Sequence, residues 1–352
     1  MPSLTKAKDE VLIALSVRKL IERGWLTALL GYLAKREELS VRLRYIGDIK
    51  LGRFEFGSLA ISTYYAIKYA TKCWPKLPDE LARTASRFPK TQEAFSWLVT
   101  ALSLASYACR LQTLGNEVSI DMSLERVGLE VNGVPAVFNT HCVNADDIAE
   151  TFAEGMYEVP EVLFGLRGRD VIDVGANTGD TALYFVLNGA RKVIAVEPLP
   201  NVARCAEENV RLSGATDKVK VINAALSNEP VSVPCDYDVL LSRYFSTLKD
   251  SGTCRVPGVT LSELLDMIDD SYLLKMDCEG CEAQVILGPE RERLKAFEHI
   301  IFETHPGASG VSNYKLLASL KELGFECRHL GHGSKRDVGM YHCVKNIVSK
   351  VT

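Results

Sequence analysis

The chain has 352 residues, of which 47% are hydrophobic and 24% are charged. This composition is typical of a globular protein, and the length suits two domains better than one. The formal net charge of −4 excludes a general electrostatic attraction to nucleic acid. The charge is uneven, because residues 1–110 contain 18 Lys and Arg against 10 Asp and Glu, whereas residues 111–352 contain 23 against 35.

The ten cysteines show no spacing typical of a disulfide framework, and no signal peptide is recognisable. We therefore expect reduced cysteines and a cytoplasmic location. Cys278 and Cys281 form one C-x-x-C pair, but no second pair follows at a spacing typical of zinc sites. We interpret both as small packing residues.

Residues 1–112 are expected to form an all-helical accessory domain. Apolar residues recur at helical spacing in residues 4–34, and a second helix is predicted from Ser58 to Thr71. The most apolar segment is Ala94–Cys109, sixteen residues without a charge, which is short for a membrane span. We expect a buried helix there and no membrane span.

Residues 113–165 are expected to form a β-hairpin and a helix that precede the central domain. Apolar residues alternate on both sides of Asn132-Gly133, which is the strongest short-range signal for a hairpin. A short helix is predicted from Asp146 to Glu154. Tyr157 follows, and we expect its ring near the next glycine turn, where it either covers a ligand or packs in the core.

The segment from Asp170 to Pro198 has the pattern of a strand, a glycine turn, a helix and a second strand. Val171–Val174 is a β-branched run that ends at Gly175, and Val193–Val196 is a second apolar run. Two strands joined by a helix must be parallel and buried on both faces. The turn has two glycines instead of the three that hold a pyrophosphate, which disfavours NAD and FAD.

Strands and helices continue to alternate to the end of the chain, which predicts an α/β fold for residues 166–352. Further strands are expected at Val219–Asn223, Tyr272–Met276, Ile300–Phe302, Phe325–His329 and Met340–Val344. Together the strands form a doubly wound, mostly parallel sheet of seven strands. The stretch from Glu229 to Arg255, where contacts to a substrate are expected, has no pattern that we can interpret.

Ligands of such a sheet bind at the carboxyl ends of the strands. The residues with useful chemistry there are Asp173 and the glycine turn, Glu197, Asn223 with Ala224, Asp277–Glu282, and Glu303–His305. A carboxylate at the end of the second strand can accept both ribose hydroxyls of an adenosine.

Three sequence blocks resemble those of the FkbM family of S-adenosylmethionine-dependent methyltransferases, which have the class I, Rossmann-like fold. The blocks are Asp173–Gly179 (DVGANTG), Val196–Pro198 (VEP) and Leu274–Glu282 (LKMDCEGCE). The family typically shows D-V-G-A-N-x-G, E-P and K-I-D-V-E-G-A-E. The resemblance covers about residues 145–345, whereas the first 110 residues resemble nothing that we recognise.

This resemblance implies O-methylation of a hydroxyl on a sugar, polyketide or related small molecule, with S-adenosyl-L-methionine as cofactor. It assigns the methionine end of the cofactor to Asp173, Gly175, Ala176, Asn177 and Gly179. Glu197 would bind the ribose and Pro198 would follow it in the cofactor site, while Asn223 and Ala224 would lie at the adenine edge. Asp277 would border the transferred methyl group.

Methyl transfer requires an acceptor oxygen in line with the sulfonium methyl group and a base that takes its proton. The candidate catalytic residues are Asp277, Glu279 and His305. The pKa range of a histidine suits a base, although a His before a Pro could simply hydrogen-bond its loop. The same three residues could hold a divalent cation, but no tight ligand spacing supports this, and we assign no metal ligands.

The favoured partner is a small-molecule or glycan acceptor, with the N-terminal domain shaping the acceptor site or a homodimer contact. The alternative is an RNA methyltransferase whose N-terminal domain contacts phosphates through Arg42, Arg44, Lys50 and Arg53. The acidic remainder of the chain and the lack of a recognisable RNA-binding motif disfavour it. A third hypothesis is a non-catalytic scaffold, which the intact glycine turn and the carboxylates within Asp277–Glu282 disfavour.

Overall fold

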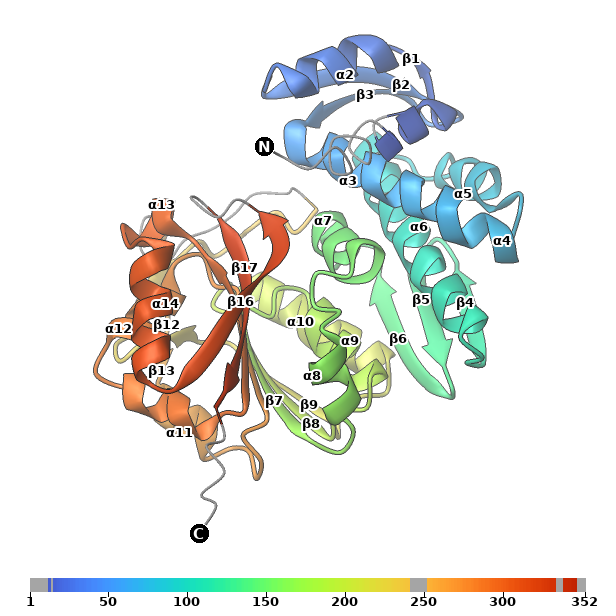
Figure 1. The fold of residues 1–352 in the computed structure, drawn as a ribbon. Coiled ribbons are helices and arrows are strands. Elements are labelled where there is room, and N and C mark those ends of the chain that lie inside the picture. Colours follow the sequence, from blue (N-terminus) through green and yellow to red (C-terminus); the bar gives the residue numbers. More distant parts are fainter. Residues whose placement is uncertain (1–11, 14, 241–251, 334–337, 347–352) are drawn as a thin grey trace. The chain divides into compact units, whose positions relative to one another are not determined.

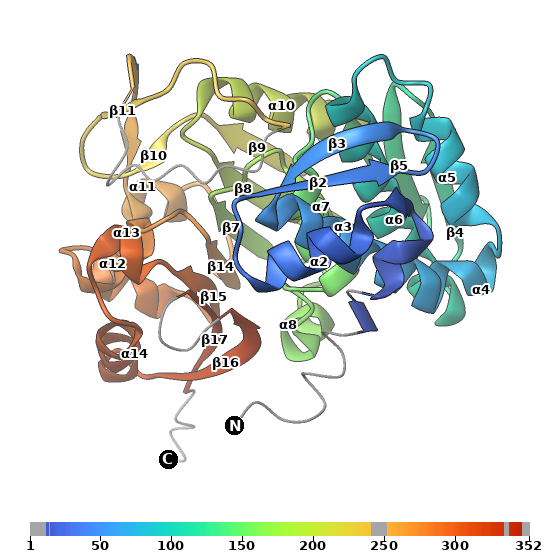
Figure 2. The same cartoon turned by 90° about the horizontal axis from the view of Figure 1, so that it is seen from above.

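The computed structural model describes residues 12–13, 15–240, 252–333 and 338–346 (Figures 1 and 2). The chain forms two compact units, Met1–Gly155 with Asp238–Ser242, and Met156–Tyr237 with Arg243–Thr352. The sequence stretch Glu229–Arg255, where acceptor contacts are expected, falls partly outside the described residues, because residues 241–251 are not described.

The expectation of an all-helical N-terminal domain is wrong, because the first unit contains a three-stranded antiparallel sheet. Its strands β1 (Ile21–Arg23), β2 (Glu38–Leu43) and β3 (Gly47–Gly52) pair in that order. Buried and exposed residues alternate along β2 and β3. This period of two is typical of a half-buried strand, but the exposed members include charged residues that equally fit a solvated basic segment.

Helices form the middle of the first unit. They are α2 (Trp25–Leu33), α3 (Arg53–Tyr65), α4 (Thr71–Cys73), α5 (Leu77–Ala85) and α6 (Thr91–Thr113), with short 3₁₀ and π-helical turns at Val17–Lys19 and Ala66–Ala70. All residues from Ala94 to Cys109 in α6 are buried, as expected for a core helix. Within the described residues, α6 is the one helix long and apolar enough to cross a membrane, and 89% of its most apolar window is buried.

The predicted hairpin is present and has a third strand. Strands β4 (Val118–Met122), β5 (Arg126–Val131) and β6 (Val134–Asn139) form an antiparallel sheet in chain order. Both Asn132 and Gly133 have positive φ, which is the geometry that a tight two-residue hairpin turn requires. Helix α7 (Ala145–Ile148) and a π-helical turn (Ala149–Glu154) follow.

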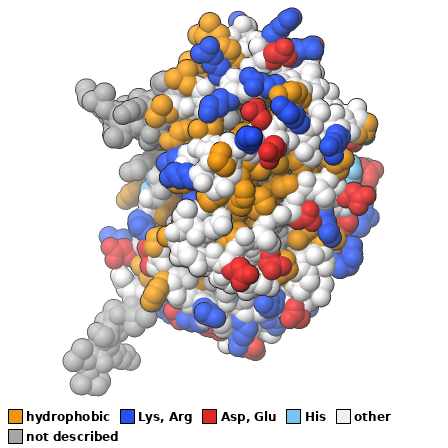
Figure 3. Space-filling model, turned by 90° about the vertical axis from the view of Figure 1, so that its right-hand side faces the viewer, with side chains coloured by type: hydrophobic (Ala, Val, Ile, Leu, Met, Phe, Trp, Pro, Cys, Tyr) orange, Lys and Arg blue, Asp and Glu red, His pale blue; other side chains and the backbone are white. Residues whose placement is uncertain are grey.

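Three of the four basic residues proposed to contact phosphates are paired with acidic residues of the first unit. The contacts are Arg42 with Glu22 and Asp48, Arg44 with Asp79, and Lys50 with Glu38, at 2.9–3.5 Å, while the Arg53 guanidinium lies over the Tyr32 ring. On the face of the molecule drawn in Figure 3, Lys and Arg side chains likewise lie among Asp and Glu and are separated by hydrophobic side chains.

The second unit contains the predicted mostly parallel sheet of seven strands, in the order β16-β17-β15-β14-β7-β8-β9. The five parallel strands are β7 (Asp170–Val174), β8 (Lys192–Val196), β9 (Val219–Ile222), β14 (Leu273–Met276) and β15 (His299–Thr304). Strands β16 (Phe325–Gly333) and β17 (Gly339–Lys345) complete the sheet as an antiparallel pair. All seven correspond to expected strands.

Helices cover both faces of this sheet, as Figure 1 shows. Helices α9 (Asp180–Leu187) and α10 (Pro200–Leu212) lie on one face, and α11 (Leu261–Leu265), α12 (Cys281–Leu287) and α14 (Asn313–Glu322) lie on the other. The remaining short elements are α8 (Pro160–Gly165), a 3₁₀ turn (Arg291–Ala296), α13 (Pro306–Ser309), β10 (Ala225–Leu226), β11 (Val231–Val233), β12 (Cys254–Val256) and β13 (Gly258–Val259). Because both faces are covered, β7 and β14 are buried along their whole length.

The expectation of reduced cysteines is wrong. Disulfides join Cys73 to Cys109, Cys235 to Cys254, Cys278 to Cys281 and Cys327 to Cys343. The residues of these four pairs are 3 to 36 positions apart, so no single spacing identifies the partners. The C-x-x-C pair forms a disulfide in the turn between β14 and α12. Its two cysteines are therefore more than small packing residues.

Candidate active site

The glycine turn lies at the carboxyl end of β7, directly against the end of β14. Gly175 has a φ of +73°, and a Cβ built on it would lie 1.8 Å from the backbone oxygen of Asp277. The amides of Gly175 and Ala176 both donate to the Val196 carbonyl, at 2.9 and 3.1 Å. Only glycine fits at position 175, and its small size brings the ends of three strands together.

Asp173 is occupied by contacts within the protein. Its carboxylate accepts a hydrogen bond from Thr181 Oγ1 at 2.6 Å and lies 3.0 Å from Lys275 Nζ. Lys275 in turn donates to the Gly175 carbonyl at 2.7 Å. Burial alone would lower the pKa of Lys275, but the neighbouring carboxylates of Asp173, Asp277 and Asp180 raise it above its ordinary value. Asp173 therefore acts on the glycine turn through Lys275.

Glu197 directly follows β8, and its carboxylate is turned toward the glycine turn. Its Oε2 accepts the amide of Asn177 at 3.1 Å, and its Oε1 accepts the amide of Leu199 at 2.8 Å. Each oxygen keeps a second lone pair for a ligand hydroxyl. Burial raises the pKa of Glu197 to about 7, although these two backbone hydrogen bonds oppose that rise.

The expected adenine-side residues follow β9. Asn223 Nδ2 donates to the carbonyls of Glu197 and Pro198, at 2.9 and 3.0 Å, which fixes the chain on both sides of Pro198. Ala224 is buried in the hydrophobic core of the sheet. These contacts place Asn223 beside the Glu197-Pro198 segment.

Asp277 follows β14 and is oriented by a tyrosine. The Tyr157 hydroxyl donates to Asp277 Oδ2 at 2.9 Å, and the Tyr157 ring packs edge-on against Phe185. The backbone amide of Asp277 donates to the Val174 carbonyl at 3.0 Å. The structure therefore places Tyr157 close to the glycine turn, where its hydroxyl holds the Asp277 carboxylate.

His305 lies at the centre of a cluster of carboxylates. Its Nε2 is 3.3 Å from Glu303 Oε2, 3.5 Å from Glu279 Oε1 and 3.8 Å from Asp277 Oδ1. The three predicted catalytic residues, Asp277, Glu279 and His305, are thus brought together. The fourth member, Glu303, was not among them. We call these four residues the acidic cluster.

Glu282 orients His305 from the other side of the ring. It is fully buried, and its Oε1 contacts His305 Nδ1 at 3.2 Å and accepts the His305 amide at 2.8 Å. Its Oε2 accepts the amide of Gly280 at 3.0 Å. Glu282 does not pair with Lys275, although both belong to the Leu274–Glu282 block, because Lys275 pairs with Asp173.

The members of the acidic cluster shift one another's pKa values. Burial raises the pKa of Glu279 to about 8 and that of Glu303 to about 7, and the nearby carboxylates add to both shifts. Burial alone would lower the pKa of His305, but its contacts with Glu282, Glu303 and the other carboxylates raise it to about 11. At neutral pH the imidazole is therefore protonated, and Glu279 and Glu303 have the pKa values suited to a base.

One signal could have added Glu303 and Lys275 to the candidates. Each lies at the carboxyl end of a parallel strand, two residues before a predicted site residue. The contact between Tyr157 and Asp277 spans 120 residues and has no local signal.

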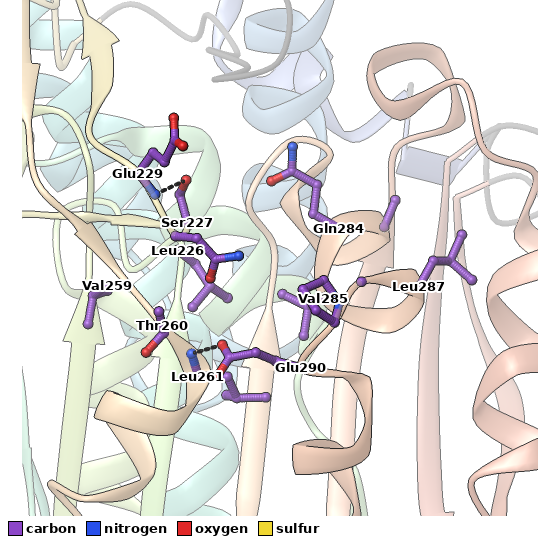
Figure 4. A pocket seen from close by; sticks show the side chains of 14 residues that line it. Leu226, Ser227, Glu229, Val259, Thr260, Leu261, Gln284, Val285, Leu287 and Glu290 are labelled. Carbon is purple, nitrogen blue, oxygen red and sulfur yellow. Dashed lines mark hydrogen bonds between the residues drawn. The ribbon is translucent and has the colours of Figure 1, made fainter.

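A separate cavity of about 540 Å³ lies between the β10–β13 pair and α12 (Figure 4). Leu226, Val259, Gln284 and Leu287 line it, whereas no member of the acidic cluster does. The carboxylate of Glu290 at its rim accepts the amide of Leu261 at 2.8 Å and so caps α11. We assign this residue a structural role.

A doubly wound sheet with this glycine turn after its first strand and a carboxylate after its second defines a Rossmann-like, S-adenosylmethionine-dependent methyltransferase domain of class I. Residues 173–327 match the Methyltransferase FkbM domain, and this part of the chain belongs to that family.

Two curated relatives illustrate the range of similarity. Methyltransferase sdnD of Sordaria araneosa is 26% identical over 191 residues, which are 44% of this chain and 73% of the relative. Protein arginine N-methyltransferase 6 of Xenopus laevis is 38% identical over 79 residues, 22% of either chain. The chain thus spans less than a quarter of that arginine methyltransferase.

Solved methyltransferase structures show weaker similarity. The METTL16 MTase domain aligns with 15% identity and a TM-score of 0.37, over 72% of this chain and 80% of its own. Magnesium protoporphyrin IX methyltransferase from Synechocystis PCC 6803, with bound SAM, aligns with 12% identity and a TM-score of 0.35, over 57% of this chain and 83% of its own.

Proposed function

We propose that this chain transfers the methyl group of S-adenosylmethionine to a hydroxyl oxygen of a sugar, a glycan or another small molecule. The observation behind this proposal is the acidic cluster beside the glycine turn. A hydroxyl is a poor nucleophile until its proton is removed, and two carboxylates with pKa values of about 7 and 8 suit that task at neutral pH.

The residues at the ends of β7 and β8 fit the cofactor. The two oxygens of Glu197 each have an acceptor position left for a ribose hydroxyl, and the glycine turn offers backbone groups for the methionine end. When bound, the cofactor supplies a methyl group already activated by its positively charged sulfur. The protein then has to hold the acceptor oxygen in line with that methyl group.

In methyl transfer, the acceptor would lose its hydroxyl proton to the carboxylate of Glu279 or Glu303. When bound, the cofactor would supply the methyl carbon to the acceptor oxygen and keep the electron pair of its S–C bond on sulfur. His305, as an imidazolium, holds these carboxylates in place.

The RNA hypothesis remains the alternative, because the N-terminal segment has an excess of basic residues. Arg42, Arg44 and Lys50 lie within 3.5 Å of carboxylates, which reduces the field that they offer to phosphates. The arginine methyltransferase relatives point to a protein arginine as acceptor, but each match with the Xenopus or rice enzymes spans at most 30% of the relative.

The first experiment is calorimetric titration of S-adenosylmethionine into the full chain, into Glu197→Gln and into Glu207→Gln as a control on an exposed helix position. We expect Glu197→Gln to lose about 1.5–3 kcal/mol of binding free energy, the cost of a charge-assisted hydrogen bond. Glu207→Gln should bind like the wild type. No binding by the wild type would overturn the proposed function.

The acceptor is then identified by transfer of a labelled methyl group. Hydroxylated metabolites and glycans, mixed RNA and arginine-containing peptides are offered separately to the same enzyme. Label on a hydroxyl oxygen supports the proposal, whereas label on RNA or on arginine selects one of the other acceptors.

A further inference from the structure

We propose that Asp277, Glu303 and His305 form a binding site for one divalent cation. One ligand atom from each residue lies within 4.8 Å of the others. Ligands about 2.1 Å from a shared ion are about 3–4.2 Å apart, so a small side-chain rotation brings all three onto one centre. This site departs from the sequence-based expectation of no metal ligands.

In two of the three ligands, a neighbouring residue holds one polar atom while the other polar atom faces the common centre. Tyr157 donates to Oδ2 of Asp277, and it is the other oxygen, Oδ1, that faces His305. Glu282 contacts Nδ1 of His305, and it is Nε2 that faces the carboxylates. A carboxylate on the far nitrogen is the usual partner of a metal-binding histidine, because it fixes the tautomer and the ring orientation.

Glu282 is well suited to that supporting role. Its Oε1 accepts the backbone amide of His305, and its Oε2 accepts the amide of Gly280, so both oxygens are fixed to the loops on either side. It is fully buried and does not itself reach the common centre. The histidine is thus held in place independently of the two carboxylate ligands.

The charge balance of the site also favours a cation. Asp277, Glu279, Glu282 and Glu303 surround a single imidazole. The buried lysine beside Asp173, Lys275, is 3.0 Å from that carboxylate and donates to the Gly175 carbonyl. A divalent ion would replace the proton on Nε2 of His305 and compensate the excess negative charge of half-buried carboxylates, which solvent alone screens poorly.

The mixed ligand set indicates the class of ion. Two carboxylates and one imidazole suit a first-row divalent metal such as Mn²⁺ better than Ca²⁺, which prefers oxygen ligands throughout. Three protein ligands leave positions open for water or an acceptor hydroxyl. If the proposed function holds, the ion would bind the acceptor oxygen and lower the pKa of its hydroxyl, and Glu279 would take the proton.

Cation binding is measured on the full chain after EDTA treatment, without cofactor, by titration with Mn²⁺ followed by calorimetry and electron paramagnetic resonance. The variants are Glu303→Gln and His305→Gln, with Glu326→Gln at an exposed position of β16 as the control. We expect one Mn²⁺ per chain, a loss of affinity of at least tenfold in both site variants and none in the control. Equal binding in all four proteins, or none at millimolar Mn²⁺, would overturn the site.

Two further measurements separate this proposal from the proposed function. Mn²⁺ should raise the melting temperature of the wild type and not that of Glu303→Gln. This measurement detects cation binding without an activity assay, so it does not depend on knowing the acceptor. S-adenosylmethionine binding should be the same for wild type and Glu303→Gln, which confirms that the variant is folded. Mn²⁺ binding without cofactor binding refutes the methyltransferase proposal alone, and the reverse result refutes the cation site alone.

Discussion

Lys275 and Asp173 form a buried ion pair, with Nζ 3.0 Å from Oδ1, on the two central strands of the sheet. The two residues are direct neighbours in the register of β14 and β7. Since Lys275 also donates to the Gly175 carbonyl, the pair connects the sheet to the glycine turn.

Lys275→Met should lower the free energy of unfolding by about 3–5 kcal/mol, because it leaves the Asp173 charge buried without a partner. The double variant Lys275→Met with Asp173→Asn removes that charge and should recover part of the loss. Urea unfolding of the three proteins measures both effects. A cost below about 1 kcal/mol for the single variant would show that the ion pair contributes little to stability.

Gly175→Ala tests the close approach of the turn to β14. A Cβ at this position meets the Asp277 carbonyl at 1.8 Å, and the φ of +73° is unfavourable for alanine. We expect a loss of about 3 kcal/mol or more, together with loss of cofactor binding. Gly214→Ala is the matched control, because its φ is +59° and no atom lies within 4 Å of the added carbon. It should cost about 1 kcal/mol and leave binding unchanged.

Cofactor affinity should depend on the ionisation of Glu197. Its pKa is about 7, and the ionised carboxylate is the better acceptor for two ribose hydroxyls. Binding of S-adenosylmethionine should therefore weaken as the pH falls from 8 to 6. Glu197→Gln has no charge to lose, so its weaker binding should change less over the same range. Parallel pH profiles for the two proteins would assign the dependence to another group.

The second unit was predictable because its signals are local. β-branched runs bounded by glycines identify each parallel strand, and the positions after the strands contain the residues that the structure brings together. Asp277, Glu279 and His305 were found in this way. Glu303 requires one further step, which is to extend the candidates from His305 back into the carboxyl end of β15.

Other features depend on pairing between distant segments. The contact of Lys275 with Asp173 follows from the register of β14 on β7, which no sequence pattern specifies. The sheet of β1–β3 was missed although Leu39, Val41 and Leu43 alternate with exposed residues, because charged side chains at the intervening positions fit a solvated segment equally well. Packing decides between these two interpretations, and it is not visible locally.

The buried pair of His299 and His342 should make the protein sensitive to mild acid. Their ring nitrogens are 3.0 Å apart on neighbouring strands. Burial lowers both pKa values, and the charge of His299 lowers that of His342 further, to about 4. As the pH falls below about 6.5, the unfolded chain takes up protons that the folded chain cannot, so this pair reduces stability between pH 6.5 and 4.

Urea unfolding of the wild type and His342→Gln at pH 7.5, 6.5 and 5.5 measures the effect. The raised pKa values of Glu197, Glu279 and Glu303 have the opposite sign, because folded carboxyls that bind protons more tightly gain stability as the pH falls. Those carboxyls are present in both proteins, so the difference between the two isolates the histidine pair. We expect the wild type to lose stability relative to His342→Gln at pH 5.5. A difference that does not change with pH would mean that the two histidines accept a proton in the folded protein as readily as in the unfolded chain.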